Sequence, residues 1–157
     1  MHGLLFVDVA ALNILNPKIA MILIPVLAAC GSEDTDVPTV AGRWYTEAQI
    51  ETGRALYEVN CAVCHGADGS ATADWRTPGQ DGQYPPPPLN GTAHTWHHPL
   101  EVLDYTIENG GGEFGGVMPG FAALLQRNQR LSIVAFIQSW WPDDIYVKWE
   151  EIDDRSR

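Results

Sequence analysis

The chain has few cysteines and few basic residues, and each shortage excludes a class of function. Only three of its 157 residues are cysteine, so it lacks the second cysteine pair that a structural zinc site would need beside Cys61 and Cys64. Nine Lys and Arg stand against twenty Asp and Glu, which gives a net charge of −11. Phosphate backbones repel such a chain, and we therefore expect no nucleic-acid partner.

The chain also lacks a clean apolar run of the roughly 20 residues that a membrane-spanning helix needs. Polar residues and prolines interrupt the stretch that begins at Gly3, which is the alternative place for such a helix. The longest apolar run is residues 19–29, which follow Lys18. This run has the length of a signal-peptide core, so we expect a signal peptide over residues 1–29.

The four residues that end this run, Leu27 to Cys30, resemble the lipobox of bacterial lipoproteins. The resemblance implies that Cys30 is lipidated, becomes the first residue of the mature chain, and ties it to a membrane through the lipid alone. It also implies a periplasm-facing location, and Gly31 after Cys30 favours the outer membrane. Residues 30–43 are mostly polar and acidic without periodicity, so we expect a flexible tether.

The segment Cys61-Ala62-Val63-Cys64-His65 carries the clearest chemical signal in the chain. C-x-x-C-H is the attachment pattern of a c-type haem, in which two thiols bond to the vinyl groups of one porphyrin. On a helix Cys61 and Cys64 share one face, and His65 follows directly as a ligand for the iron. A thioredoxin-like redox motif would need a βαβ context, which the sequence does not predict. We therefore predict one covalently bound haem c.

The sixth position on the iron has one preferred candidate. Met1 and Met21 fall within the predicted signal peptide, so Met118 is the only methionine expected in the mature chain. Residues 115–121 around it are rich in glycine, which allows the backbone to approach a flat cofactor closely. The alternatives are an open position or one of three histidines: His94, His97 and His98.

With these motifs the chain resembles the small class I cytochromes c over roughly residues 46–141. Gly53 and Tyr57 lie eight and four residues before Cys61, where that family has a glycine and an aromatic residue on its first helix. Residues 133–137 resemble the last helix of the family, which crosses the first one at this glycine. The resemblance implies an all-α, cytochrome c-like fold. Its helices would pack around one covalently bound haem, with a long loop wrapped around the cofactor.

Further site residues follow from the same resemblance. Pro87 and Leu89 look like the family's proline-containing loop, in which a proline carbonyl accepts a hydrogen bond from the haem histidine and a leucine packs on the haem edge. We find no counterpart of the family's propionate-binding arginine, and Arg76 and Trp96 are the candidates to replace it. Apart from the resemblance, Tyr105 projects from the next predicted helix, and we expect it to approach the haem on the side of the sixth ligand.

Three histidines stand within five residues in the segment from His94 to His98. A cluster of this kind is able to bind copper or zinc. The alternative is a loop at the haem propionates, to which histidine and tryptophan side chains donate hydrogen bonds.

The remaining pattern predicts where the helices lie. A capping box formed by Thr46 and Gln49 begins a helix that reaches about residue 60. Pro99 begins the next helix, and the glycines 110–112 end it. The last helix spans about 128–140, since a proline follows it.

Two segments have no helical pattern. Residues 66–98 hold many glycines and prolines, and an irregular loop of this length is usual only where something else organises the chain. Residues 143–157 are rich in acidic side chains, and we expect an acidic, solvated C-terminal tail. Between tether and tail, residues 44–142 form the predicted cytochrome c domain, in which a short helix is expected at residues 120–126.

The resemblance implies an electron carrier and not an enzyme. With His65 and Met118 on the iron, the site would be closed to small molecules, and a His/Met pair raises the potential. The partners would be redox proteins with basic docking patches that attract the acidic chain. Two alternatives stay open. One is a haem enzyme, or a sensor of gas or peroxide, with a labile sixth site. The other is a fixed haem subunit of a larger oxidoreductase.

Overall fold

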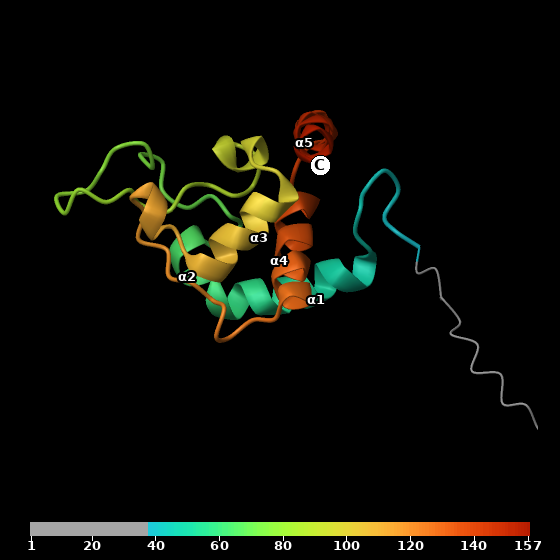
Figure 1. Cartoon of the computed structure of the whole chain (residues 1–157), viewed down its shortest axis with the longest axis horizontal. Coiled ribbons are helices and arrows are strands. Elements are labelled where there is room, and N and C mark those ends of the chain that lie inside the picture. The colour runs from blue at the N-terminus through green and yellow to red at the C-terminus, as the bar shows by residue number, and fades with distance from the viewer. Residues whose placement is uncertain (1–37) are drawn as a thin grey trace, which may run out of the picture. The chain divides into compact units, whose positions relative to one another are not determined.

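Helices are the regular elements in the part of the chain that the computed structural model describes, residues 38–157 (Figure 1). In chain order they are α1 (Glu47–Asn60), α2 (Ala62–His65), the 3-10 helix η1 (His94–His97), α3 (Leu100–Asn109), the 3-10 helix η2 (Gly112–Phe114), α4 (Arg127–Ser139) and α5 (Asp143–Ser156). The prediction of an all-α fold is confirmed. None of the helices in this range is long and apolar enough to cross a membrane. The predicted signal peptide, Cys30 and the tether as far as residue 37 lie outside the described residues.

α1 begins where the sequence predicts it, because Thr46 and Gln49 form the capping box. The Gln49 backbone N–H donates to the Thr46 hydroxyl oxygen over 3.2 Å, and the Thr46 N–H donates to the Gln49 side-chain oxygen over 2.9 Å. The buried face of the helix holds Ile50, Gly53 and Tyr57, as their i, i+3, i+7 spacing indicated.

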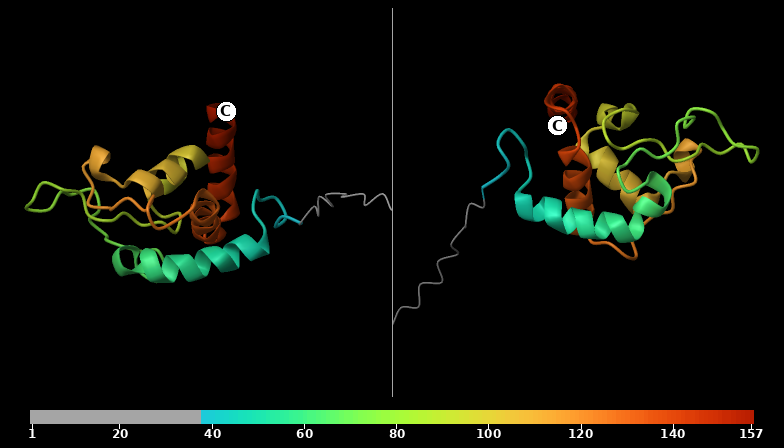
Figure 2. Two further views of the ribbon diagram at one scale, coloured as in Figure 1. Left: turned by 60° about the horizontal axis from the view of Figure 1, so that its bottom comes forward. Right: turned by 180° about the vertical axis from the view of Figure 1, so that it is seen from behind.

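α1 crosses α4 at Gly53 (Figure 2). A methyl group at Gly53 would lie 1.9 Å from the carbonyl oxygen of Ser132, so only glycine lets the two backbones approach this closely. Beside this contact, Phe136 of α4 packs edge-on against Tyr57 of α1, with ring centroids 5.4 Å apart. The expected crossing of the first helix by the helix that holds residues 133–137 is therefore present.

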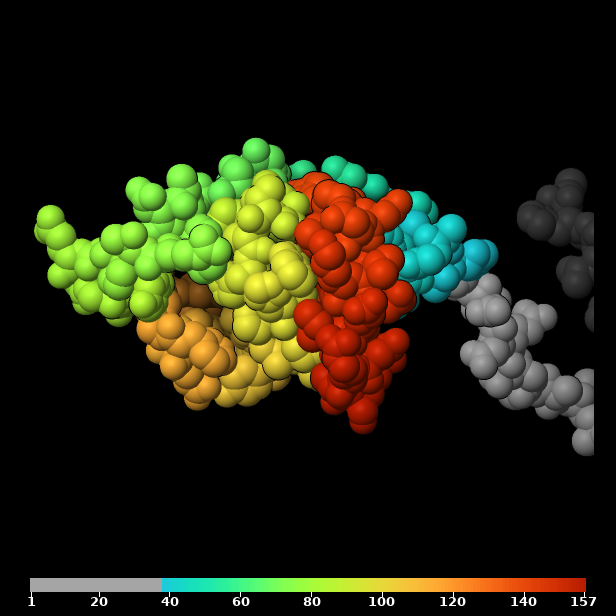
Figure 3. Space-filling model, turned by 90° about the horizontal axis from the view of Figure 1, so that it is seen from above, coloured from blue at the N-terminus to red at the C-terminus, as the bar shows by residue number. Residues whose placement is uncertain are grey.

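The acidic C-terminal segment is a packed helix, and its prediction as a solvated tail is wrong. α5 lies against the segment before α3 (Figure 3) and buries Trp149 to 1% exposure. The Trp149 indole donates to the carbonyl of His98 over 3.0 Å, and the buried Asp153 accepts from the backbone N–H of Leu100 over 2.7 Å. Asp153 thereby satisfies one of the free N–H groups at the start of α3. The physical reason is periodicity, since Tyr146, Trp149 and Asp153 share one face of the helix.

The tether ends earlier than predicted. The Val40 N–H donates to the carbonyl of Tyr45 over 2.8 Å, and the Arg43 guanidinium pairs with Asp143 of α5 at 2.7 Å. Val40 and Arg43 therefore belong to the packed domain, and the contact of Arg43 with α5 is one that the sequence alone does not reveal.

Residues 120–126 form a turn, and the prediction of a short helix there is wrong. The N–H groups of Phe121 and Ala122 donate to the carbonyls of Ile107 and Glu108 over 2.9 and 3.0 Å. The segment is thus held against the end of α3, and its own helical bonds are limited to the one turn from Phe121 to Leu125.

The long loop after α2 lies beside the segment that carries Met118. The Tyr84 N–H donates to the carbonyl of Gly115 over 2.8 Å, in an isolated parallel bridge. Figure 3 shows this loop in green, extending beyond the helices on one side. Near the end of the loop, the Leu89 N–H donates to the carbonyl of Gly69, which lies near its start, over 2.7 Å. The loop therefore connects the His65 side of the domain with the Met118 side.

Candidate haem-binding site

Cys61 and Cys64 lie where α1 passes into α2. The N–H groups of Cys64 and His65 both donate to the Cys61 carbonyl, over 3.1 and 2.9 Å, so the motif forms one helical turn. Both thiols are free; that of Cys61 is buried and that of Cys64 exposed. Burial, with a smaller contribution from Cys64, raises the pKa of the Cys61 thiol to about 11. Two free thiols on one turn have the spacing that the vinyl groups of one porphyrin require.

His65 is buried, and one hydrogen bond holds its ring. Its Nδ1 lies 3.0 Å from the carbonyl oxygen of Pro87. A carbonyl only accepts, so Nδ1 carries the proton and Nε2 keeps the lone pair that a metal ion needs. Burial lowers the pKa of His65, against a smaller opposing effect of the bond to Pro87, and the imidazole therefore stays neutral. Such a bond also fixes the orientation of a ligating ring.

Three successive carbonyls of the loop are held in place by side chains. After Pro87, the Pro88 carbonyl accepts from the Thr95 hydroxyl over 3.0 Å, and the Leu89 carbonyl accepts from the Trp141 indole over 2.7 Å. Leu89 itself packs against the core. Thr95 and Trp141 were not among the predicted site residues. Trp141 stands 52 residues from its acceptor, so no local pattern joins the two.

Met118 lies in an irregular segment beside the end of α3. Its carbonyl accepts from the Gly111 N–H over 2.9 Å, and its side chain is half-buried against the core. Gly110 has φ of +89°, and a methyl group there would lie 2.6 Å from the Met118 carbonyl oxygen. Gly110 is thus required by a close backbone contact. The role of Met118 as an iron ligand stays a prediction.

The other two predicted haem contacts belong to η1 and α3. Trp96 is half-buried, packs against the core, and has the Lys148 ammonium 6.0 Å from its ring centroid. Tyr105 is exposed on α3, and its hydroxyl donates to Glu113 over 3.0 Å. This bond ties Tyr105 to η2, the turn that precedes the Met118 segment. Contact of Trp96 or Tyr105 with haem stays a prediction.

The histidine cluster is packed around His94. Its ring stacks on Trp75 with centroids 4.4 Å apart and meets the ring of His98 at 5.3 Å, while Arg76 lies over the Trp75 ring at 4.4 Å. The buried Nδ1 of His94 has no hydrogen-bond partner among the described residues. In the same part of the chain, no three His, Cys, Asp or Glu side chains are placed to hold a metal ion, so copper or zinc gains no support. An unpaired buried polar atom instead suits a propionate oxygen.

The residues present fit a haem c. Two free thiols on one turn, a neutral imidazole with Nε2 available, and a thioether on a glycine-rich segment are the donors that covalent attachment and axial ligation use. The unpaired nitrogen of His94 adds a polar group of the kind that a propionate would satisfy.

The fold and these donors define a cytochrome c domain, and comparison with known proteins agrees. Residues 48–137 match the family described as cytochrome c oxidase, cbb3-type, subunit III, and the chain belongs to this family. A stretch of 39 residues is 54% identical to thiosulfate dehydrogenase of Allochromatium vinosum, covering 25% of this chain and 13% of that protein. The match thus spans a small part of that relative. No solved structure matches the chain.

Membership of this family carries three conclusions. The predicted class of protein, a class I-like c-type cytochrome, is confirmed. Its cofactor is haem c, and its function is haem-based electron transfer.

Proposed function

We propose that this chain is a periplasmic, lipid-anchored monohaem cytochrome c that carries single electrons between redox proteins and catalyses no reaction of its own. The observation that carries the proposal is the 3.0 Å contact of His65 Nδ1 with the Pro87 carbonyl, directly after the C-x-x-C pair. Because Nδ1 carries the proton in this contact, Nε2 is the nitrogen of the buried, neutral ring whose lone pair is available to iron. A single C-x-x-C-H in the 157 residues supports one haem.

Each residue of the site has a separate task in this proposal. Cys61 and Cys64 would hold the porphyrin by two thioether bonds, and His65 Nε2 and the Met118 sulfur would bind the iron. Bound haem supplies one reversible electron between ferric and ferrous iron. Pro87 keeps the His65 ring from turning, and Met118 keeps small molecules from the sixth position. If the same two protein ligands stay bound in the ferric and the ferrous state, the geometry around the iron changes little on electron transfer.

Mass and absorption spectra together test this assignment. The denatured protein should retain one haem through extraction with acid and organic solvent, and Cys61→Ala with Cys64→Ala should yield no holoprotein. The wild-type haem should be low-spin in both oxidation states and should not bind carbon monoxide at once. Extractable haem would contradict covalent attachment. Immediate carbon monoxide binding would favour the haem enzyme or sensor.

The lipid anchor and the location depend on Cys30. Because Leu-Ala-Ala-Cys closes an apolar run, the mature native protein should begin at Cys30 and carry acyl chains. Mass spectrometry of the mature N-terminus measures this, and Cys30→Ala should release the domain from membranes. An unmodified Cys30 in the mature protein would overturn the anchor. More than one acyl chain is expected, since a single chain binds membranes only marginally.

The comparisons favour a second function: the domain is a fixed haem subunit of a larger oxidoreductase. The family is described as an oxidase subunit. The thiosulfate dehydrogenase of Allochromatium vinosum is an enzyme, and the match covers 13% of its length. Purification from native membranes at low and high salt separates the two functions. A fixed subunit stays with a partner in constant ratio at both salt concentrations. A shuttle elutes alone once its ionic contacts are screened.

A further inference from the structure

The Met118 segment, residues 118–125, has few bonds that fix its position. Near its start, the Met118 carbonyl accepts from Gly111, and in its middle two N–H groups reach the carbonyls at the end of α3. At its far end, the carbonyl of Leu125 accepts from Arg130 Nη1 over 3.0 Å. The segment contains no helix or strand, so these contacts with α3 and α4 determine where it lies.

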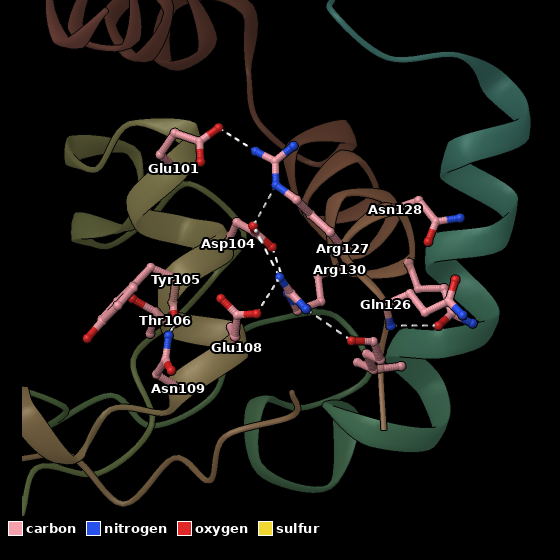
Figure 4. Close-up of polar contacts among 12 residues, drawn as sticks. Glu101, Asp104, Tyr105, Thr106, Glu108, Asn109, Gln126, Arg127, Asn128 and Arg130 are labelled. Atoms are coloured by element: carbon pink, nitrogen blue, oxygen red, sulfur yellow. Dashed lines mark hydrogen bonds and ion pairs between the residues drawn. The ribbon is translucent and has the colours of Figure 1, made fainter. Parts of the chain in front are cut away.

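Arg130 joins three parts of the domain through one guanidinium group (Figure 4). Its Nε donates to Asp104 Oδ1 over 2.7 Å and its Nη2 approaches Glu108 Oε1 at 3.0 Å, both on α3. The remaining Nη1 reaches the Leu125 carbonyl. Arg130 and Asp104 are each only 4% exposed. Because the guanidinium is planar and rigid, the positions of α3, α4 and the end of the Met118 segment are fixed together.

We propose that Arg130 is a positioning residue for the sixth iron ligand: it anchors the Met118 segment and so limits how often the thioether leaves the iron. The inference rests on the proposed ligation by Met118. A thioether is a weak ligand, and its occupancy of the iron depends on the free energy of local opening of the segment that carries it. A contact that disfavours opening therefore acts on the iron without touching it.

Arg127 provides a matched control on the same helix. Its Nε donates to Asp104 Oδ2 over 3.2 Å and its Nη2 pairs with Glu101, so it also joins α4 to α3. It is 54% exposed, and within residues 38–157 its side-chain hydrogen bonds and ion pairs go to those two carboxylates. Removing Arg127 therefore deletes its ion pairs with Asp104 and Glu101 but leaves the hydrogen bond from Arg130 to the Leu125 carbonyl in place.

The test uses the holoprotein and three variants. Arg130→Lys keeps a positive charge opposite Asp104 but lacks the second guanidinium nitrogen that donates to the Leu125 carbonyl. The pair Asp104→Leu with Arg130→Met replaces the buried ions with apolar side chains, which preserves packing and avoids an unpaired buried carboxylate. Arg127→Gln is the control. The measurements are the rate at which imidazole replaces the sixth ligand of the ferric protein, the thioether–iron charge-transfer band, and the thermal midpoint.

Both Arg130 variants should bind imidazole roughly tenfold faster than the wild type, the change expected when one charge-assisted hydrogen bond to the segment is lost. Arg127→Gln should stay within about twofold, as an exposed ion pair contributes little. If imidazole rates follow the thermal midpoint across all variants, or if Arg130→Lys matches the wild type, Arg130 has a structural role only and the inference is wrong. A wild type that lacks the charge-transfer band would overturn the proposed ligation by Met118 itself.

Discussion

At the scale of single residues, Met118 decides the chemistry of the proposed site. A thioether stabilises ferrous over ferric iron relative to an imidazole, so Met118→His should give a low-spin haem with a lower potential that still transfers electrons. The decrease should be on the order of 0.2 V, a fraction of the range of about 0.8 V that axial ligands span. Met118→Ala should give high-spin haem that binds carbon monoxide. Redox titration and carbon monoxide difference spectra measure both changes.

The exposed neighbour Val117 offers the control, since Val117→Ala should change neither the potential nor carbon monoxide binding. A Met118→Ala protein that stays low-spin would mean that another side chain has moved onto the iron. Adding His94→Ala, His97→Ala or His98→Ala, one at a time, then tests which histidine it is. Wild-type spectra that do not change in Met118→His would rule out Met118 as the ligand.

Gly53 is the residue on which the helix crossing depends. Gly53→Ala places a methyl group 1.9 Å from the backbone oxygen of Ser132, and a backbone cannot rotate aside as a flexible side chain can. We expect a loss of roughly 1–3 kcal/mol in the free energy of unfolding, despite the better helix propensity of alanine. Denaturant unfolding measures the loss.

Gly112→Ala is the control for this substitution, because a methyl group at Gly112 has no neighbour within 4 Å. Its free energy of unfolding should stay within about 0.5 kcal/mol of the wild type. An unchanged stability in Gly53→Ala would mean that α1 and α4 are further apart than the structure has them.

The sequence predicted best the structures that form between residues close together in the chain. The Thr46–Gln49 capping box and the C-x-x-C-H turn involve neighbours, and both form as expected. The contact of His65 with Pro87 joins residues 22 apart, and only the resemblance to a family anticipated it. The Asp104–Arg130 pair was not predicted, because two charged residues 26 positions apart meet only once α3 and α4 have packed.

At the scale of elements, α5 should prove necessary for stability. Trp149→Ala removes a side chain that is 1% exposed, together with its hydrogen bond to the His98 carbonyl. We expect a loss of roughly 3–5 kcal/mol in the free energy of unfolding, the usual cost of deleting a buried tryptophan. Chemical denaturation of the holoprotein measures it, with the oxidation state held constant.

Val147→Ala, at an exposed position of the same helix, should cost less than about 0.5 kcal/mol. If removal of residues 143–157 left the unfolding transition unchanged, the segment would be the solvated tail that its composition predicts.

The prediction that residues 143–157 form a solvated tail, where the structure has α5, was wrong for a physical reason. Charged residues outnumber apolar ones in this segment, so its average composition is that of a solvated chain. The signal lay in periodicity, because Tyr146, Trp149 and Asp153 recur at i, i+3 and i+7. Pro142 before it, with Asp143 and Asp144 in the first turn, also marks the start of a helix. The turn at 120–126 could not be predicted in this way, because backbone bonds to α3 determine it.

At the scale of the whole molecule, charge should govern the rate of encounter. Residues 1–29 hold one acid, Asp8, and one base, Lys18, so their removal leaves the net charge at −11. A cationic metal-complex reductant should therefore reduce the haem at least about tenfold faster at low salt than at high salt. Stopped-flow absorbance measures the rate constants.

An anionic complex of similar potential is the control, and its rate should rise with salt because screening removes repulsion. Rates that are independent of salt for both complexes would mean that the acidic charge lies away from the site of electron entry. The expectation that partners have basic docking patches would then lose its support.

The burial of Cys61 has a consequence for the order in which the protein matures. In the folded domain Cys61 is 8% exposed, and burial raises the pKa of its thiol to about 11, so little thiolate is present at neutral pH. We therefore expect the thioether bond to form before the domain has folded. α4 begins 66 residues after Cys61, at Arg127, and is therefore synthesised later. The interval before it arrives is the period in which the chain stays open to modification, and variants that fold faster without cofactor should mature less completely.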